Sequence, residues 1–192
     1  MRSDNFVLFN ELPSEYSNLI SNQMTTDLPC TNWASLYKVI SNTNFAIQNI
    51  PNSNITDLAL KNDYLAQAYA MRALCYFYAV RVWGDVPVYL EPVDNLDKGV
   101  YKTRTSKEEI YNNVILPDLK QAELLINPGN VERKRISRNA IYAILADVQM
   151  WLQDYEGAEQ TIDKLMSNTT YTAFEPDMDK MKKTFVEDLN NK

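Results

Sequence analysis

The sequence predicts an all-α protein of tetratricopeptide-like helix-turn-helix pairs that pack as an α-α superhelix, with irregular loops. Three observations predict this fold class. Apolar residues recur every three or four positions over most of the chain, which is the period of a helix with a buried face. Glycine is scarce, with 4 residues among 192, so the turns of a β-hairpin array are missing. Alanine, leucine, lysine and glutamate, which favour helices, are plentiful.

The chain is expected to form a single domain of 192 residues. We expect residues 1–32 to be a loop-rich lead-in, in which 14–24 fit a short helix. Residues 33–168 are predicted to be the tetratricopeptide-like helical core, and residues 169–192 an irregular tail.

The first helix pair is predicted over residues 33–83. Its first helix should end before Pro51, because a residue that precedes proline avoids the helical region. Its second helix is apolar almost all round and is therefore expected to be central. Gly84 ends it, and Pro87 keeps it from resuming. One expected apolar stripe of this helix comprises Tyr64, Ala68, Met71, Cys75, Tyr78 and Val82.

A third helix is predicted to begin at Ser106 with a capping box. In such a box the serine hydroxyl accepts a hydrogen bond from the amide of Glu109, and the glutamate carboxylate reaches back to the serine. Pro117 should kink or split this helix, because a proline inside a helix removes a backbone donor and clashes with the preceding turn.

The last helix pair shows the tetratricopeptide pattern most clearly. It is predicted to begin near Ser137 and to turn at Gln153-Asp154, and so short a turn makes the two helices antiparallel. Ala146 and Ala158 lie twelve residues apart, at the two small positions of that repeat. The expected faces are Ile141, Leu145, Val148 and Leu152 on one helix, flanked by Ala140, Ala143 and Ala146, and Tyr155, Ala158, Ile162 and Leu165 on the other.

Composition excludes several classes of function. The net charge of −6 argues against a nucleic-acid partner, which needs an excess of cations. The chain has no histidine, so histidine triads, histidine-bound zinc and histidine acid–base chemistry are excluded. Asp177 and Asp179 lack the glycine and closing glutamate of a calcium loop and are interpreted as solvated charges. No catalytic residue, metal site or cofactor is expected.

Arg72 is the unusual residue of the most apolar helix, because a buried guanidinium must be paired. Asp85, Asp118 and Asp147 are the candidate partners, and we expect a structural ion pair in preference to a ligand contact. Trp83 is similarly expected to belong to the core and not to a sugar-stacking surface.

The sequence also bears on redox state and location. Cys75 is predicted to be a buried thiol, although a disulfide with Cys30 stays possible. Residues 64–83 are long enough to span a membrane but carry Arg72 and Arg81, so we expect a buried helix. The chain begins without the apolar stretch of a secretion signal, which at face value indicates a cytoplasmic protein.

Two segments of the first helix pair resemble the hallmark of the SusD/RagB-like proteins. They are YAMRALCYFY over residues 69–78 and RVWGDVP over 81–87, and similar blocks cover about residues 30–166 in order. The residues that carry the motif are Trp33, Arg72, Trp83, Gly84, Asp85 and Pro87, with Trp83 where the family usually has tyrosine.

The resemblance implies a surface lipoprotein of Bacteroidetes outer membranes. Such proteins capture glycans or other oligomeric nutrients without catalysis and form a lid over a SusC-type TonB-dependent transporter. It also implies a lipid anchor in the full-length form, whereas this chain shows neither a signal nor a lipidated N-terminal cysteine. The family continues into a longer C-terminal ligand-binding part, so we interpret the chain as a truncated helical core.

Side-chain amides and carboxylates bind sugar hydroxyls, so Asn22, Asp27 and Asn32 in the loop before the first clear helix are the candidate ligand residues. Two alternative functions stay open. An intracellular tetratricopeptide-type protein–protein adaptor is favoured by the missing secretion signal, and a helical enzyme has no residues to support it.

Overall fold

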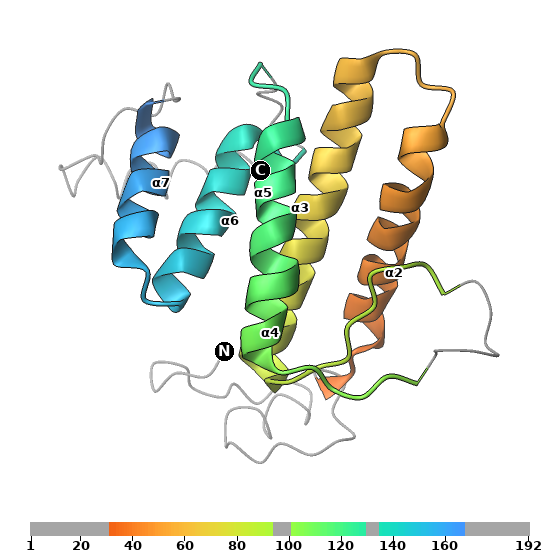
Figure 1. Ribbon diagram of the computed structural model, residues 1–192, viewed down its shortest axis with the longest axis vertical. Helices are drawn as coiled ribbons and strands as arrows, with labels where there is room; N and C mark the ends of the chain where they lie inside the picture. Colours follow the sequence, from red (N-terminus) through yellow and green to blue (C-terminus); the bar gives the residue numbers. More distant parts are fainter. Residues whose placement is uncertain (1–30, 94–100, 130–134, 168–192) are drawn as a thin grey trace, which may run out of the picture.

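The computed structural model describes residues 31–93, 101–129 and 135–167, and these confirm the predicted all-α class (Figure 1). Its helices lie side by side in the order α2, α3, α5, α6 and α7. No β-strand occurs in the described ranges, which contain one isolated bridge between Val86 and Thr105. The elements are α2 (Ala34–Asn49), the 3-10 turn η2 (Ile50–Asn52), α3 (Leu58–Trp83), α4 (Lys107–Ile110), the π-helical turn η3 (Tyr111–Ile115), α5 (Leu116–Leu125), α6 (Arg138–Trp151) and α7 (Tyr155–Ser167).

The predicted helix boundaries coincide with capping side chains. Asp57 precedes α3 and accepts hydrogen bonds from the amides of Ala59 and Leu60 at 2.9 and 3.1 Å. Ser137 caps α6 in the same way and accepts from the amide of Ala140 at 3.3 Å. Each cap satisfies amides of a first turn, which have no partner inside the helix.

Ser106 and Pro117 together shape the third predicted helix. The Ser106 hydroxyl accepts a hydrogen bond from the Glu109 amide at 3.2 Å, which confirms the first half of the capping box. The return bond from the Glu109 carboxylate is absent from the hydrogen bonds of the described residues. Pro117 does not split the helix, because α4, η3 and α5 follow one another without a gap and the residues at both junctions have helical dihedral angles. The irregularity expected at Pro117 is instead the π-helical turn η3 directly before it, which keeps the helix continuous.

The main core forms where α3 packs against α2, η3, α5 and α6. Tyr76 and Phe77 are its largest fully buried side chains. A smaller cluster, rich in alanine, joins α3 to α5 and α6. The predicted stripe on α3 is wrong at Tyr78 and Val82, which are 53% and 59% exposed. A helix that is apolar all round does not reveal which side its neighbours cover, and these two residues lie on an uncovered side.

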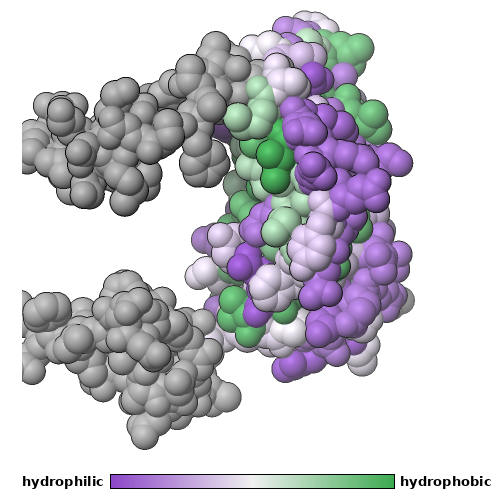
Figure 2. Space-filling view, turned by 90° about the vertical axis from the view of Figure 1, so that its left-hand side faces the viewer, coloured by the Kyte–Doolittle hydropathy of each residue, from purple (hydrophilic) through white to green (hydrophobic). Residues whose placement is uncertain are grey.

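The contact between α6 and α7 depends on small residues, as the repeat pattern predicts. Ala146 and Ala158 are 7% and 1% exposed there, and the Thr161 hydroxyl donates to the Gln149 side-chain oxygen at 2.7 Å. Other residues that the sequence places on the packing faces of α6 and α7 are exposed. The reason is that α7 covers only one side of α6, and α6 covers only one side of α7. These residues are Ala143, Leu152, Tyr155 and Ile162. Figure 2, which looks onto the α7 side, shows mostly hydrophilic side chains with apolar ones between them.

Cys75 is a free, buried thiol, and burial raises its pKa from 9.0 to about 11. The structure therefore favours the predicted buried thiol over a disulfide with Cys30, which lies outside the described residues. Among the described helices, none combines the length and apolarity that crossing a membrane requires.

A side chain at Gly84 is expected to destabilise the protein, although the space around this residue is open. Its φ of +73° is a conformation that L-residues rarely adopt, while a Cβ there would meet no atom within 4 Å. Gly84→Ala should therefore lower the free energy of unfolding by about 1–3 kcal/mol through backbone strain alone, measured by chemical denaturation. Gly129→Ala is the matched control, because its Cβ would meet only the Asn127 side-chain oxygen at an ordinary 3.5 Å. Equal effects of the two substitutions would contradict this.

Candidate functional site

Arg72 pairs with Asp118 inside the helix layer. The guanidinium Nε and Nη2 donate to the two carboxylate oxygens of Asp118, each at 2.7 Å, and the residues are 6% and 5% exposed. The two other candidate partners are engaged elsewhere: Asp85 accepts from the Lys107 amide at 2.9 Å, and Asp147 pairs with Arg81 at 3.4 Å. Arg72 thus makes the structural ion pair that the sequence predicts. Burial raises the pKa of the Asp118 carboxyl, and the guanidinium opposes that rise.

Residues 86–93, which we call the rim segment, run beside α2 and α3 in an extended conformation without joining a sheet. Side chains replace the missing strand partner, because each carbonyl from Pro87 to Glu91 accepts a side-chain hydrogen bond. The donors are Tyr37 to Pro87, Lys102 to Val88, Asn44 and Tyr76 to Tyr89, Arg72 to Leu90, and Asn44 to Glu91. The Tyr89 amide donates in turn to the Tyr76 hydroxyl at 2.7 Å. The rim segment is therefore a fixed wall.

A pocket of about 350 Å³ lies between α2 and the rim segment. This volume is within the range of about 300–1,000 Å³ that small-molecule sites occupy. Most of its lining is aromatic or aliphatic, with a few polar groups. The lining residues are Trp33, Ala34, Tyr37, Ile40, Ser41 and Asn44 from the α2 side and Pro87, Tyr89, Glu91 and Val93 from the rim segment.

The aromatic rings of the pocket hold one another in position. Trp33 and Tyr37 stack with ring centroids 6.0 Å apart, and Tyr37 meets Tyr89 edge-on at 5.9 Å. Two cations lie over this cluster: Arg104 is 5.2 Å from the Trp33 ring, and Lys102 is 5.0 Å from the Tyr89 ring. Such pairs add to the energy of burial and fix ring orientation, so the pocket walls are preformed.

The polar groups of the pocket divide into those used by the fold and those left for a ligand. Asn44 is 1% exposed, and its amide is engaged with Arg72 and with the carbonyls of the rim segment. The Tyr37 hydroxyl donates to Pro87 at 2.6 Å, and burial raises its pKa, so it stays a proton donor. Ser41 and Glu91 are exposed, and neither side chain has a hydrogen bond among the described residues. They can bind hydroxyl groups of a ligand.

The sequence-predicted ligand residues lie near this pocket only in part. Asn22 and Asp27 fall outside the described residues. Asn32 is exposed and precedes Trp33, and its side-chain oxygen accepts from the Ala34 amide at 2.8 Å, which caps the start of α2. Asn32 is not among the lining residues, so its role in binding stays a prediction.

The motif residues position the pocket. Trp33 lines it, and Trp83 packs against Trp33 with ring centroids 6.0 Å apart. Trp83 packs against the core as expected but is only partly buried. Gly84 turns the chain out of α3, and Asp85 fixes the start of α4. The lining residues Tyr37 and Tyr89 were not predicted from the sequence, because nothing in the spacing of residues shows that α2 and the rim segment lie side by side. The one feature of the sequence that could have indicated them is that aromatic residues recur along α2 and again just after Pro87.

A family model and a curated protein that are similar to this chain are both SusD-like. Residues 1–150 match the model of a SusD-like family described as starch-binding and associating with the outer membrane. SusD-like protein P38 of Formosa agariphila is 30% identical over 173 residues, which are 89% of this chain and 33% of that protein. The chain thus spans about a third of the length of this curated relative.

Solved structures share the fold. The crystal structure of a SusD superfamily protein from Parabacteroides distasonis aligns with a TM-score of 0.71 and 30% identity, covering 84% of this chain and 36% of that one. A laminarin-binding SusD-like protein aligns with a TM-score of 0.71 at 19% identity, covering 79% and 33%. The second likeness concerns the fold alone.

Proposed function

Because this chain belongs to the SusD-like family, we propose that it captures glycans in the pocket between α2 and the rim segment, without catalysing a reaction. The observation that carries the proposal is the composition of the pocket. It combines preformed aromatic walls around Trp33 and Tyr37 with an exposed hydroxyl and carboxylate at Ser41 and Glu91. Sugars present apolar C–H faces to aromatic rings and hydroxyl groups to polar side chains.

The same pocket supports binding over hydrolysis. Cleavage of a glycosidic bond ordinarily requires two carboxyl groups on opposite sides of the bond. Among the described lining residues, Glu91 is the only carboxylate, and it is exposed. The phenol of Tyr37 has a raised pKa and donates to a backbone carbonyl, so it is not placed to act as a base.

The setting of this function is also part of the proposal. The family is described as associating with the outer membrane. We propose that the full-length protein is lipid-anchored at the cell surface and delivers glycans to a SusC-type TonB-dependent transporter. The described helices would then serve as the scaffold domain of that protein, with residues 33–168 as its core. Accessibility of the protein to protease on intact cells tests the location, and full protection would contradict it.

Replacing Trp33 tests the pocket directly. Trp33→Ala is expected to weaken the binding of a neutral oligosaccharide about ten-fold, because it removes an aromatic wall of the pocket and the ring against which Tyr37 packs. Isothermal titration of the chain with maltoheptaose and with laminarihexaose measures this. The matched control is Tyr78→Ala, which removes a half-exposed aromatic residue from α3 outside the pocket. Binding that is absent from the wild-type chain, or equal in the two variants, would refute the proposed site.

A further inference from the structure

Outside the pocket, two residues from α3 and two from α6 interleave, with Phe77 buried in the core and the other three at the surface. Phe77 and Arg81 lie one turn apart on α3, and Asp147 and Trp151 lie one turn apart on α6. The Arg81 guanidinium lies between the two rings, 4.8 Å from the Phe77 centroid and 4.7 Å from that of Trp151. It also pairs with Asp147 at 3.4 Å.

These contacts fix the Trp151 ring while leaving it accessible. The indole meets the Phe77 ring edge-on at 6.5 Å. Trp151 is nevertheless 52% exposed. Arg81 lies 4.7 Å from the centre of the ring, and the exposed half of Trp151 remains accessible to a ligand. A ring that is ordered before binding spares a ligand the entropy cost of ordering it.

We propose that Trp151, with Asp147 beside it, is a second carbohydrate-binding site that stacks a sugar ring of an uncharged oligosaccharide. The open indole face would take the C–H face of the sugar, and the Asp147 carboxylate, with its side chain 61% exposed, would accept hydrogen bonds from hydroxyl groups. The Arg81 cation balances the Asp147 carboxylate with which it pairs. Asp154, exposed at the turn that follows α6, leaves a net negative charge on this side of the helix end, which disfavours uronic or sulfated glycans.

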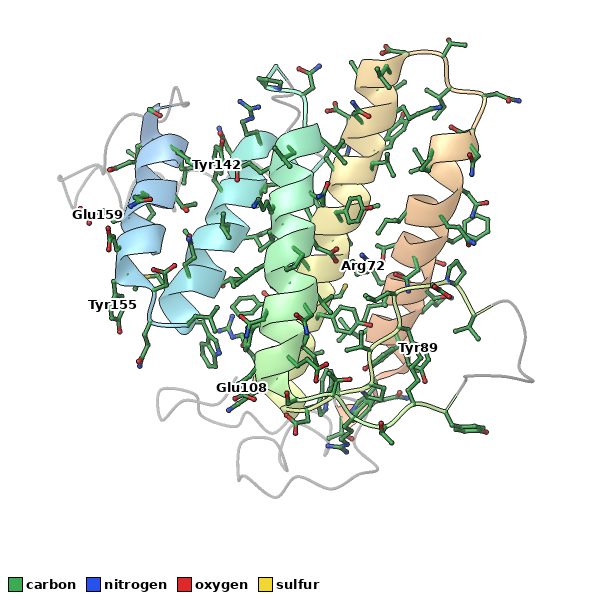
Figure 3. All side chains as sticks on the ribbon, in the orientation of Figure 1. Arg72, Tyr89, Glu108, Tyr142, Tyr155 and Glu159 are labelled. Atoms are coloured by element: carbon green, nitrogen blue, oxygen red, sulfur yellow. The ribbon has the colours of Figure 1, made fainter. Side chains whose placement is uncertain are left out.

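The helix end that carries Trp151 lies toward the same end of the molecule as the pocket. α6 ends and α7 begins at the end of the molecule where α2 begins and α3 ends. Tyr155, at the start of α7, and Glu108 in α4 are labelled at this end in Figure 3, and Tyr89 of the pocket lies toward the same end. The end of α6, which carries Trp151, and the pocket therefore lie toward the same end of the helices. The inference rests on glycan capture as the proposed function, but the two sites are separable by experiment.

The tryptophans are the reporters for that experiment. Trp33 belongs to the pocket, Trp151 to the second site and Trp83 to neither lining, and the chain has no other tryptophan. The indole N–H resonances of the ¹⁵N-labelled chain can be assigned from three single Trp→Phe variants. The labelled chain is then titrated to millimolar concentration with maltoheptaose, laminarihexaose or an oligogalacturonate.

The expected result is a saturable shift of the Trp151 resonance with at least one of the two neutral oligosaccharides and none with the oligogalacturonate. Asp147→Ala should weaken the affinity reported by Trp151 about ten-fold, because a hydrogen bond to a charged group is lost. Glu159→Ala, which removes an exposed carboxylate on the outer side of α7, should leave that affinity unchanged (Figure 3).

The other outcomes are decisive. A Trp151 resonance that does not move with either neutral oligosaccharide overturns the second site, whatever Trp33 does. A shift of Trp33 alone leaves the proposed function intact and removes only this inference. A shift of Trp151 alone supports the second site and refutes the pocket. A larger response to the oligogalacturonate than to the neutral oligosaccharides also overturns the inference.

Discussion

Arg72→Met is expected to lower the free energy of unfolding by about 3–5 kcal/mol, the largest loss from any single change considered for this protein. The substitution leaves the Asp118 carboxylate, which is 5% exposed, without its cation. It also removes the donor that Asn44 and the Leu90 carbonyl share, at 2.9 and 3.2 Å. Guanidinium unfolding at neutral pH measures the loss. The loss should shrink at acidic pH, because a protonated Asp118 needs no cation.

Two further variants identify the cause of that loss. Replacing both partners, in Arg72→Met with Asp118→Leu, should recover most of the stability, because an apolar pair needs no charge compensation. Lys164→Met breaks an exposed pair with Glu123, whose side chains are 54% and 27% exposed, and should cost less than about 1 kcal/mol. If the Arg72 and Lys164 variants lose equal stability, or if the double variant is as unstable as the single one, the buried-charge explanation is wrong.

The second large effect is a loss of stability at alkaline pH. Burial raises the pKa of Tyr76 from 10.0 to about 12, and it raises that of Tyr37 as well. The unfolded chain therefore releases these protons at a lower pH than the folded chain does. The contribution of Tyr76 is fully present below pH 10 and falls as the pH rises toward 12, by about 1.4 kcal/mol per pH unit. Tyr37 acts in the same direction. Cys75 adds the same effect between pH 9 and 11.

Tyr76→Phe separates this contribution from other alkaline titrations. The variant loses stability at neutral pH, because the Tyr89 amide and carbonyl lose their bonds to the hydroxyl at 2.7 and 2.9 Å. Above pH 10 its stability should fall less steeply than that of the wild type, by about 1.4 kcal/mol per pH unit. Urea unfolding at a series of pH values gives both slopes. Parallel slopes would show that Tyr76 does not titrate with a raised pKa.

Local chemistry explains why so much of the fold could be predicted. Asp57, Ser106 and Ser137 cap helices with their own side chains, and Gly84 ends a helix through its own backbone conformation, so each boundary is encoded within a few residues. Which face of a helix is buried, in contrast, is not encoded within a few residues. Tyr78 continues the apolar spacing of α3, but its exposure depends on where α2, α5 and α6 lie.

The binding surfaces were harder to predict for the same reason. The sequence shows that Arg72 needs a carboxylate, but spacing alone does not choose among three aspartates, and Asp118 lies 46 residues away. The pocket likewise joins Tyr37 to Tyr89 across two helices and a turn. Trp151 occupies a helix position where aromatic residues usually belong to the core, and only the packed structure shows that it is exposed.

The attachment of the rim segment allows its side chains to be exchanged. Five consecutive carbonyl groups fix it, and a carbonyl group is the same whichever amino acid carries it. The residues that hold the rim segment are therefore the hydrogen-bond donors on the helices and Lys102. Tyr89 and Glu91 can be replaced without loss of these bonds to the backbone. Such a segment separates its attachment from the side chains that line the pocket, so the lining can change on an unchanged framework.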